Sequence, residues 1–257
     1  MMDMLAALRL QLDWGADEAL DDAPQDRTQP AARAAPQPVP ADAPRPRPAP
    51  TTPPGPAVSD GTALAAAAGT LDALHAALNA YGACSLRATA TSTARPSGNP
   101  AARVVMVGEA PGADDDRAGT AFAGAAGLLL DRMLGSAGLD RMQLLLTHLV
   151  PWRPPGGRAP NEAEIQACLP FLLRLLSIVR PSGVVLLGTG PARALLRTTE
   201  GVRRIRGRWL PLALPGHDAM MALPMLGFDQ WLRSPAGKRD TWADLLLLQA
   251  GPPAPAT

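Results

Sequence analysis

The residues most able to do chemistry lie around one short loop, Gly108–Gly112, which reads Gly-Glu-Ala-Pro-Gly. An apolar, mostly β-branched run precedes the loop, and the acidic cluster Asp114, Asp115 and Asp116 follows it. A buried run that stops at a glycine-rich turn predicts a strand whose loop lies at the carboxyl edge of a sheet, where open α/β folds bind ligands. The glycines alone fit a tight turn. Glu109 gains little from packing at a strand end, so it is a candidate site residue.

The elements that must position this loop alternate along the chain. Continuous apolar runs predict strands at Arg103–Val107, Leu144–His148, Gly183–Leu187 and Ala222–Leu226. Helical patterns are found at Ala63–Asn79, Gly127–Ser136, Asn161–Val179, Gly190–Leu196 and Lys238–Gln249. Strands that alternate with helices, and that are apolar on both faces, indicate an α/β fold with a parallel sheet covered on both sides.

The rest of the chain sets the domain boundaries. Residues 1–22 carry a weak helical pattern and predict a short N-terminal arm, a possible docking site for a protein partner. Residues 23–61 are rich in proline and alanine and predict a disordered linker, either a semi-stiff tether or a low-complexity insertion. The globular domain is expected at 62–250, with a disordered tail at 251–257.

Composition excludes some classes of function. The formal net charge of +1 gives no overall bias toward nucleic acid, so a DNA-binding face would need local basic clusters. We find no secretory signal and no apolar run of membrane-spanning length. A cytoplasmic protein with reduced thiols, with no membrane partner and working as a monomer, is therefore expected.

From about Tyr81 to Leu248 the chain resembles family 4 of the uracil-DNA glycosylases, the bacterial and archaeal type. The resemblance rests on separated motifs that match in order: Gly108–Gly112 with Asp114–Asp116, Gly119 with Phe122, Trp152–Gly156 with Arg158–Pro160, Cys168–Phe171, Leu186–Gly188, Arg206–Trp209, Leu232–Pro235, and Lys238–Arg239 with Trp242. It implies a three-layer fold with a central four-stranded parallel sheet between helices. It also implies that DNA is the partner, and that a deaminated base is flipped out and its N-glycosidic bond hydrolysed.

The resemblance also assigns site residues. It implies that Gly108, Glu109 and Ala110 contact the base, and that Phe122 stacks on it, although a core role for Phe122 is the alternative. His148 stands where the family has an asparagine. An imidazole cannot present a donor and an acceptor side by side as an amide does, so His148 either reads a different base or caps the strand end.

A gapless alignment places Gly227 and Phe228 at the family's His-Pro pair. Loss of one such hydrogen-bond donor costs roughly 10²–10³-fold in rate, and His217 lies too far upstream to match it. The catalytic candidates are Glu109, Asp115 and Asp116. The two aspartates either orient a water molecule or stabilise the N-terminus of the following helix through its dipole. We expect a base-excision glycosylase of weakened activity or altered specificity. The alternative is a catalytically inactive DNA-binding or protein-interaction module on the same fold.

Two further sets of residues complete the expectations. The basic residues Arg206, Arg208, Arg233 and Lys238 are candidate contacts to the DNA backbone, or else a solvated face. Cys84 and Cys168 match two of the four cysteines that hold a [4Fe–4S] cluster in many family members, and Tyr81 and Trp152 stand at the other two positions. We therefore expect no cluster and no other cofactor, with the two aromatic rings filling the cluster's volume.

Overall fold

A computed structural model describes residues 56–214 and 220–253 of the chain. They belong to a compact unit that spans Thr52–Thr257. The predicted N-terminal arm, most of the predicted linker, His217 and the end of the tail lie outside the described residues. The first described helix, α2 (Pro56–Ala67), begins before the predicted domain boundary at residue 62.

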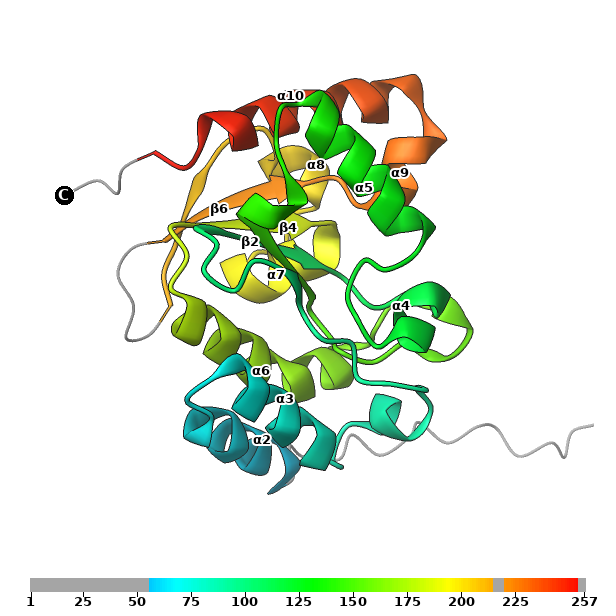
Figure 1. The fold of residues 1–257 in the computed structure, drawn as a ribbon, viewed down its shortest axis with the longest axis vertical. Helices are drawn as coiled ribbons and strands as arrows, with labels where there is room; N and C mark the ends of the chain where they lie inside the picture. The colour runs from blue at the N-terminus through cyan, green and yellow to red at the C-terminus, as the bar shows by residue number, and fades with distance from the viewer. Residues whose placement is uncertain (1–55, 215–219, 254–257) are drawn as a thin grey trace, which may run out of the picture. The chain divides into compact units, whose positions relative to one another are not determined.

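The fold is α/β, as predicted, and its sheet has six strands within the described residues, in the order β1-β3-β2-β4-β6-β5 (Figure 1). The four central strands run parallel: β3 (Leu144–His148), β2 (Val104–Gly108), β4 (Gly183–Leu187) and β6 (Met220–Met225). The two edge strands, β1 (Ser97–Gly98) and β5 (Leu210–Leu212), are antiparallel to their neighbours. The expected four-stranded parallel sheet is thus the centre of a larger mixed one. Strands of two and three residues are too short to show a periodic pattern.

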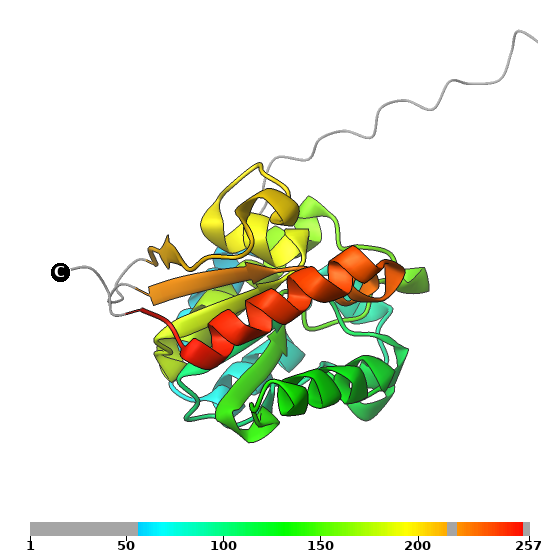
Figure 2. The same cartoon turned by 90° about the horizontal axis from the view of Figure 1, so that it is seen from above.

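Helices cover both faces of the sheet and make three layers (Figures 1 and 2). On one face α6 (Glu162–Val179) packs with α2 and α3 (Leu71–Ala80). On the other face lie α5 (Ala125–Ser136) and α10 (Pro235–Ala250). Alternate residues of β2 enter the two hydrophobic layers, because successive side chains of a strand point to opposite faces.

The predicted helix at Ala63–Asn79 is two helices in the structure, α2 and α3. The chain breaks after Ala67 because Thr70 caps α3, its hydroxyl accepting a hydrogen bond from the Ala73 N–H at 3.1 Å. The helix predicted at Gly190–Leu196 is α7 (Thr189–Leu196), one residue longer than predicted. The sequence did not predict the short helices α4 (Ala113–Ala118), α8 (Val202–Ile205) and α9 (Phe228–Arg233), nor the 3₁₀ turns η1 (Ser85–Ala88), η2 (Arg141–Gln143) and η3 (Pro155–Gly157). No helix in the described part of the chain is long and apolar enough to cross a membrane.

Candidate active site

The loops that follow β2, β3, β4 and β6 meet at the carboxyl edge of the sheet and line one cleft of about 510 Å³. All six residues predicted to contact a base line this cleft: Gly108, Glu109, Ala110, Phe122, His148 and Gly227. They come from four separate segments, one on each side of α4, one at the end of β3 and one after β6, so the fold brings together what the sequence holds far apart. The edge is the one predicted from the strand-to-loop pattern.

Gly108, the last residue of β2, lies in register with His148, the last residue of β3. A Cβ atom at Gly108 would lie 2.7 Å from Nδ1 of His148 and 2.8 Å from Cζ of Phe122. Both distances are far shorter than van der Waals contact, so only glycine lets the two rings rest on the strand end. This close packing is a second reason for glycine, beside the turn that the sequence indicated.

Asp115 is a buried carboxylate at the centre of the site. It accepts hydrogen bonds from the Ala123 N–H (2.7 Å) and the Gly112 N–H (3.1 Å). Its Oδ2 also lies 3.1 Å from Nε2 of His148. Burial raises the pKa of Asp115, but the hydrogen bond and charge of His148 and the two amides outweigh it and lower the pKa to about 2. Asp115 is therefore ionised at neutral pH.

This carboxylate fixes the proton on His148. An ionised carboxylate can only accept, so Nε2 of His148 carries the proton that bonds it. Nδ1 is buried and has no hydrogen-bond partner among the described residues. The imidazole stacks on Phe122, with ring centroids 4.6 Å apart and planes at 23°. His148 thus lines the cleft and also contacts α4, which goes beyond capping a strand end.

Phe122 lines the cleft and also belongs to the hydrophobic core. Its position therefore fits both roles that the sequence left open, stacking on a base and packing in the core. Its side chain is only 3% exposed. His148 stacks on the ring, and Phe228 contacts it in a tilted pair with centroids 5.6 Å apart. A base can stack on Phe122 only after one of these rings moves.

Glu109 reaches across the cleft to the start of α7. A Cβ atom at Gly190 would lie 2.7 Å from Oε1 of Glu109, and one at Gly188 would lie 3.8 Å from Oε2. The positive end of the helix dipole favours a carboxylate at this place. Glu109 is therefore a charged group of the cleft, as its position at a strand end suggested.

Gly227 precedes α9 on the opposite wall of the cleft. Its backbone is ordinary and extended, with φ −75° and ψ 161°. A Cβ atom there would find its nearest neighbour, the Cα of Gly188, at 3.5 Å, which is normal van der Waals contact. Neither the backbone nor the space requires glycine, so the missing side chain is not a demand of the fold.

Comparison with known proteins decides the family. The family described as the uracil DNA glycosylase superfamily matches residues 95–246, more than half of the chain. The chain belongs to the uracil DNA glycosylase superfamily.

Relatives agree with this membership. A type-4 uracil-DNA glycosylase of Pyrobaculum aerophilum is 41% identical over 109 residues, which cover 41% of this chain and 56% of the relative. One of Archaeoglobus fulgidus is 38% identical over 129 residues (49% and 65%), and one of Thermotoga maritima is 36% identical over 135 residues (50% and 69%). The chain thus spans little more than half of the first relative and about two thirds of the other two.

Among the acids of this glycosylase-family site, the structure separates three roles. Asp115 holds His148 and the loop, as described above. Asp116 accepts hydrogen bonds from the backbone N–H groups of Thr91 (2.9 Å) and Ser92 (3.0 Å) and is not among the residues that line the cleft. Asp114 pairs with Arg117 on α4. Asp116, a catalytic candidate by sequence, is therefore placed as an anchor for the preceding loop.

The four basic residues predicted to contact DNA differ in whether their side chains are paired within the fold or exposed. The Arg206 guanidinium is bound to Asp244, with Nε–Oδ2 and Nη2–Oδ1 distances of 2.9 and 2.8 Å, and to Asp240. This pairing engages the donors of Arg206 inside the fold, and its contact to the DNA backbone stays a prediction. Arg208 and Lys238 are exposed and stay predictions. The Arg233 side chain lies outside the described residues.

Arg153 is the functional candidate that sequence reasoning missed. It lines the cleft, half-buried, in the loop after β3, and no hydrogen bond or ion pair engages its side chain among the described residues. The same rule that singled out Glu109, a charged residue just beyond a buried strand, could have found it.

The prediction of no cofactor is wrong. The relatives named above are type-4 uracil-DNA glycosylases, and resemblance to that family implies a [4Fe–4S] cluster held by cysteines. These relatives overturn the expectation that this chain does without the cluster.

The four corresponding positions of this chain hold Tyr81, Cys84, Trp152 and Cys168. The Sγ atoms of Cys84 and Cys168 lie 3.9 Å apart in the core, and Tyr81 and Trp152 are buried in the same hydrophobic cluster. No group of three or more His, Cys, Asp or Glu residues suited to a metal ion occurs in residues 56–214 and 220–253. Two thiols do not supply the four thiolates of such a cluster.

Proposed function

We propose that the protein is a DNA glycosylase that hydrolyses the N-glycosidic bond of uracil or another deaminated base in DNA, with a base preference changed by His148. The observation that carries the proposal is the meeting of Gly108–Ala110, Phe122 and His148 in one cleft at the carboxyl edge of a glycosylase-family fold. The activity of the type-4 relatives supports the same reaction.

The chemistry sets what the cleft must provide. The scissile bond is inaccessible inside a duplex, so the base is flipped out into the cleft. Positive charge develops on the sugar and negative charge on the departing base. In this proposal the ionised Asp115 and the carboxylate of Glu109 favour the cationic sugar, and Glu109 orients the attacking water. Backbone N–H groups of Gly108–Ala110 would stabilise the base anion.

His148 sets the recognition of the base in this proposal. With Nε2 bonded to Asp115, Nδ1 is the remaining polar atom of the ring. In the neutral ring Nδ1 accepts one hydrogen bond, for example from a ring N–H of uracil or hypoxanthine. In the protonated ring it donates one, for example to a base carbonyl. His148 offers a base one hydrogen bond, whereas the amide of an asparagine at this position offers two. We therefore expect weaker discrimination among deaminated bases.

Purified full-length protein, incubated with oligonucleotides that contain uracil, hypoxanthine or xanthine and then treated with alkali, tests the proposal. We expect strand scission with at least one base in single- or double-stranded DNA. Glu109→Gln should lower it at least tenfold, whereas Glu162→Gln, a matched change of an exposed acid on α6, should leave it unchanged. Absence of scission with all three bases would refute the proposal.

A second candidate function is favoured by two observations. Gly227 offers no donor, and the Phe122 ring is covered by His148 and Phe228. A catalytically inactive DNA-binding module on the same fold would show salt-dependent binding of the same oligonucleotides without scission. The assay above therefore separates the two functions directly.

A further inference from the structure

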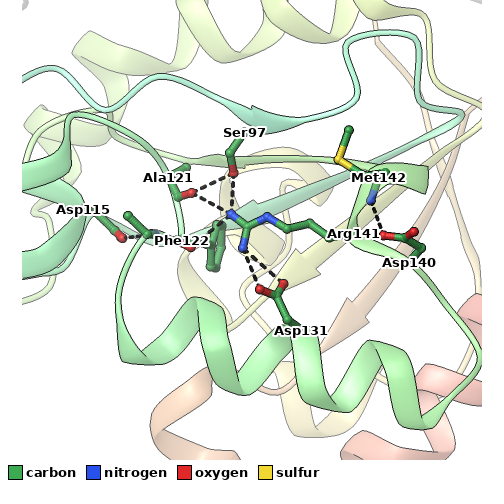
Figure 3. Close-up of polar contacts among 9 residues, drawn as sticks. Ser97, Asp115, Ala121, Phe122, Asp131, Asp140, Arg141 and Met142 are labelled. Atoms are coloured by element: carbon green, nitrogen blue, oxygen red, sulfur yellow. Dashed lines mark hydrogen bonds and ion pairs between the residues drawn. The ribbon is translucent and has the colours of Figure 1, made fainter.

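Arg141 lies in η2, just before β3, and is not among the residues that line the cleft. Its side chain is 23% exposed. The guanidinium nevertheless joins three other parts of the fold (Figure 3). Nη1 donates to both carboxylate oxygens of Asp131 on α5, at 3.1 and 3.3 Å. Nη2 donates to the Ser97 hydroxyl of β1 at 2.8 Å.

The same Nη2 also donates to two successive backbone carbonyls, those of Ala121 (3.2 Å) and Phe122 (3.0 Å). The Ser97 hydroxyl donates to the Ala121 carbonyl as well, at 2.7 Å. The loop that carries the proposed base-stacking ring is thus held from behind by one guanidinium. Figure 3 shows Arg141 between this loop and α5.

Phe122 requires such support because its backbone is unusual. Its φ is +56°, in the left-handed region that bulky residues rarely adopt. Its carbonyl is packed so tightly that a Cβ atom at Gly127 would lie 1.9 Å from the oxygen. The next amide, the Ala123 N–H, donates to Asp115 at 2.7 Å. Residue 122 is therefore fixed on its carbonyl side by Arg141 and on its following amide by Asp115.

We propose that Arg141 is a positioning residue for the base pocket: it holds Phe122 in the left-handed conformation that places the ring on His148 in the cleft. This inference rests on the proposed function for its role in catalysis. Without the guanidinium, the Phe122 carbonyl loses this donor and the Ala121 carbonyl keeps only the Ser97 hydroxyl. The backbone at Phe122 then relaxes toward negative φ, which moves the ring. A lysine cannot replace it, because an ammonium lacks the planar fork that reaches Asp131 and the carbonyls together.

A double-mutant cycle tests this inference against a merely structural role. Arg141→Met should lower the single-turnover rate of base excision by about 10²-fold through misplacement of the ring, with little change in the affinity for DNA that contains an abasic site. In a Phe122→Ala background the same change should have little further effect, because the ring through which Arg141 acts is gone. Arg141→Lys should not restore the rate.

Arg174→Met is the matched control, since the Arg174 Nε also donates to a backbone carbonyl, that of Ala68 at 2.7 Å, but between α6 and α2. It should leave excision unchanged. An equal loss from Arg141→Met with and without Phe122 would overturn the inference, because Arg141 would then act on stability alone.

Hydrogen exchange gives a readout that does not depend on activity. In Arg141→Met the amides of residues 121–127, above all that of Ala123, should exchange at least tenfold faster, while those of β4 should not change. Unchanged exchange, or faster exchange with undiminished excision, would overturn the inference. A wild-type protein that removes no base would refute the proposed function alone, and the exchange result would still decide whether Arg141 positions Phe122.

Discussion

The two walls of the cleft are built on different physical grounds. The first wall, residues 108–124, is held by polar contacts. Within it Asp115 accepts two backbone N–H groups, Asp116 accepts those of Thr91 and Ser92 in the preceding loop, and Arg141 donates to two of its carbonyls from behind. The second wall, residues 226–231, is held by aromatic packing. Phe228 contacts Trp231, whose indole N–H donates to the Leu226 carbonyl at 2.6 Å.

The resemblance implies that the first wall keeps the family's motif and that the second departs from it, and this difference in anchoring supplies a physical reason. On the first wall, each anchor leaves a buried amide or carbonyl unpaired if it is changed, which costs about 1–3 kcal/mol. On the second wall, Gly227 has no side chain that could hold the fold together, and its backbone has the extended conformation open to any residue. Residues there can change the chemistry of the cleft while the fold stays intact.

The sharpest test of the second wall is Gly227→His. Because the backbone and the space accept a side chain, the fold should tolerate it. If the missing donor limits the rate, excision of uracil should rise about 10²–10³-fold, measured under single-turnover conditions. Gly227→Ala, which adds a Cβ atom without a donor, is the control and should give no increase. An unchanged rate in Gly227→His would show that the second wall is not where activity is limited.

For the first wall, Asp115→Asn should lower excision by about 10²-fold, since the change disturbs His148 and the loop that carries Phe122 together. Stability should fall by about 1–3 kcal/mol, measured by urea denaturation at pH 7, because two amides and an imidazole lose a charged acceptor. Glu162→Gln, a change of an exposed acid on α6, should cost less than about 1 kcal/mol. Equal losses in the two variants would contradict the anchoring role of Asp115.

The same residue predicts how stability depends on acid. The pKa of Asp115 in the folded protein lies at about 2, below its ordinary value of 3.8. Its contribution to stability is therefore complete above about pH 4 and is lost as the pH falls toward 2. Unfolding measured between pH 5 and 2 should show a shallower decline in Asp115→Asn than in the wild type. Parallel curves would mean that the carboxylate is not held in its charged form.

Phe228→Pro should lower KM for uracil-containing DNA by up to about tenfold, because the ring that contacts Phe122 no longer has to move before a base can stack. Phe228 is the first residue of α9, where proline fits a helix. Phe228→Leu keeps an apolar side chain there and should change KM less. A higher KM in Phe228→Pro would show that Phe228 helps to form the base pocket.

The smallest effect is expected from Arg153→Gln. We expect the unengaged Arg153 guanidinium to contact one DNA phosphate. Its loss should therefore weaken DNA binding a few-fold, with little dependence on sequence, and reduce the salt slope by about one. Arg206→Met is the contrast, because Arg206 is bound to Asp240 and Asp244: it should destabilise the fold and leave the salt slope unchanged. The reverse pattern would place the DNA contact at Arg206.

Much of the site could be predicted from the sequence, because its loops follow long buried strands. Leu144–His148 and Gly183–Leu187 have the predicted bounds, and the residues of Gly108–Gly112 reach the cleft. The edge strands and α4 were missed because they are too short to show a period. The pairing of Arg206 with Asp244 was missed because the partners are 38 residues apart. A run of basic residues has the same sequence whether its side chains face solvent or form ion pairs inside the fold.

The sequence by itself determined the parallel core of the sheet, the edge where the site lies, and which residue types stand there, since these depend on local patterns of apolar residues and turns. Only the tertiary structure decided how those residues are used. It placed His148 on Phe122 with its Nε2 on Asp115, and Arg141 behind the loop. These contacts join segments far apart in the chain, and each depends on burial and on which donors meet which acceptors, which no local pattern records.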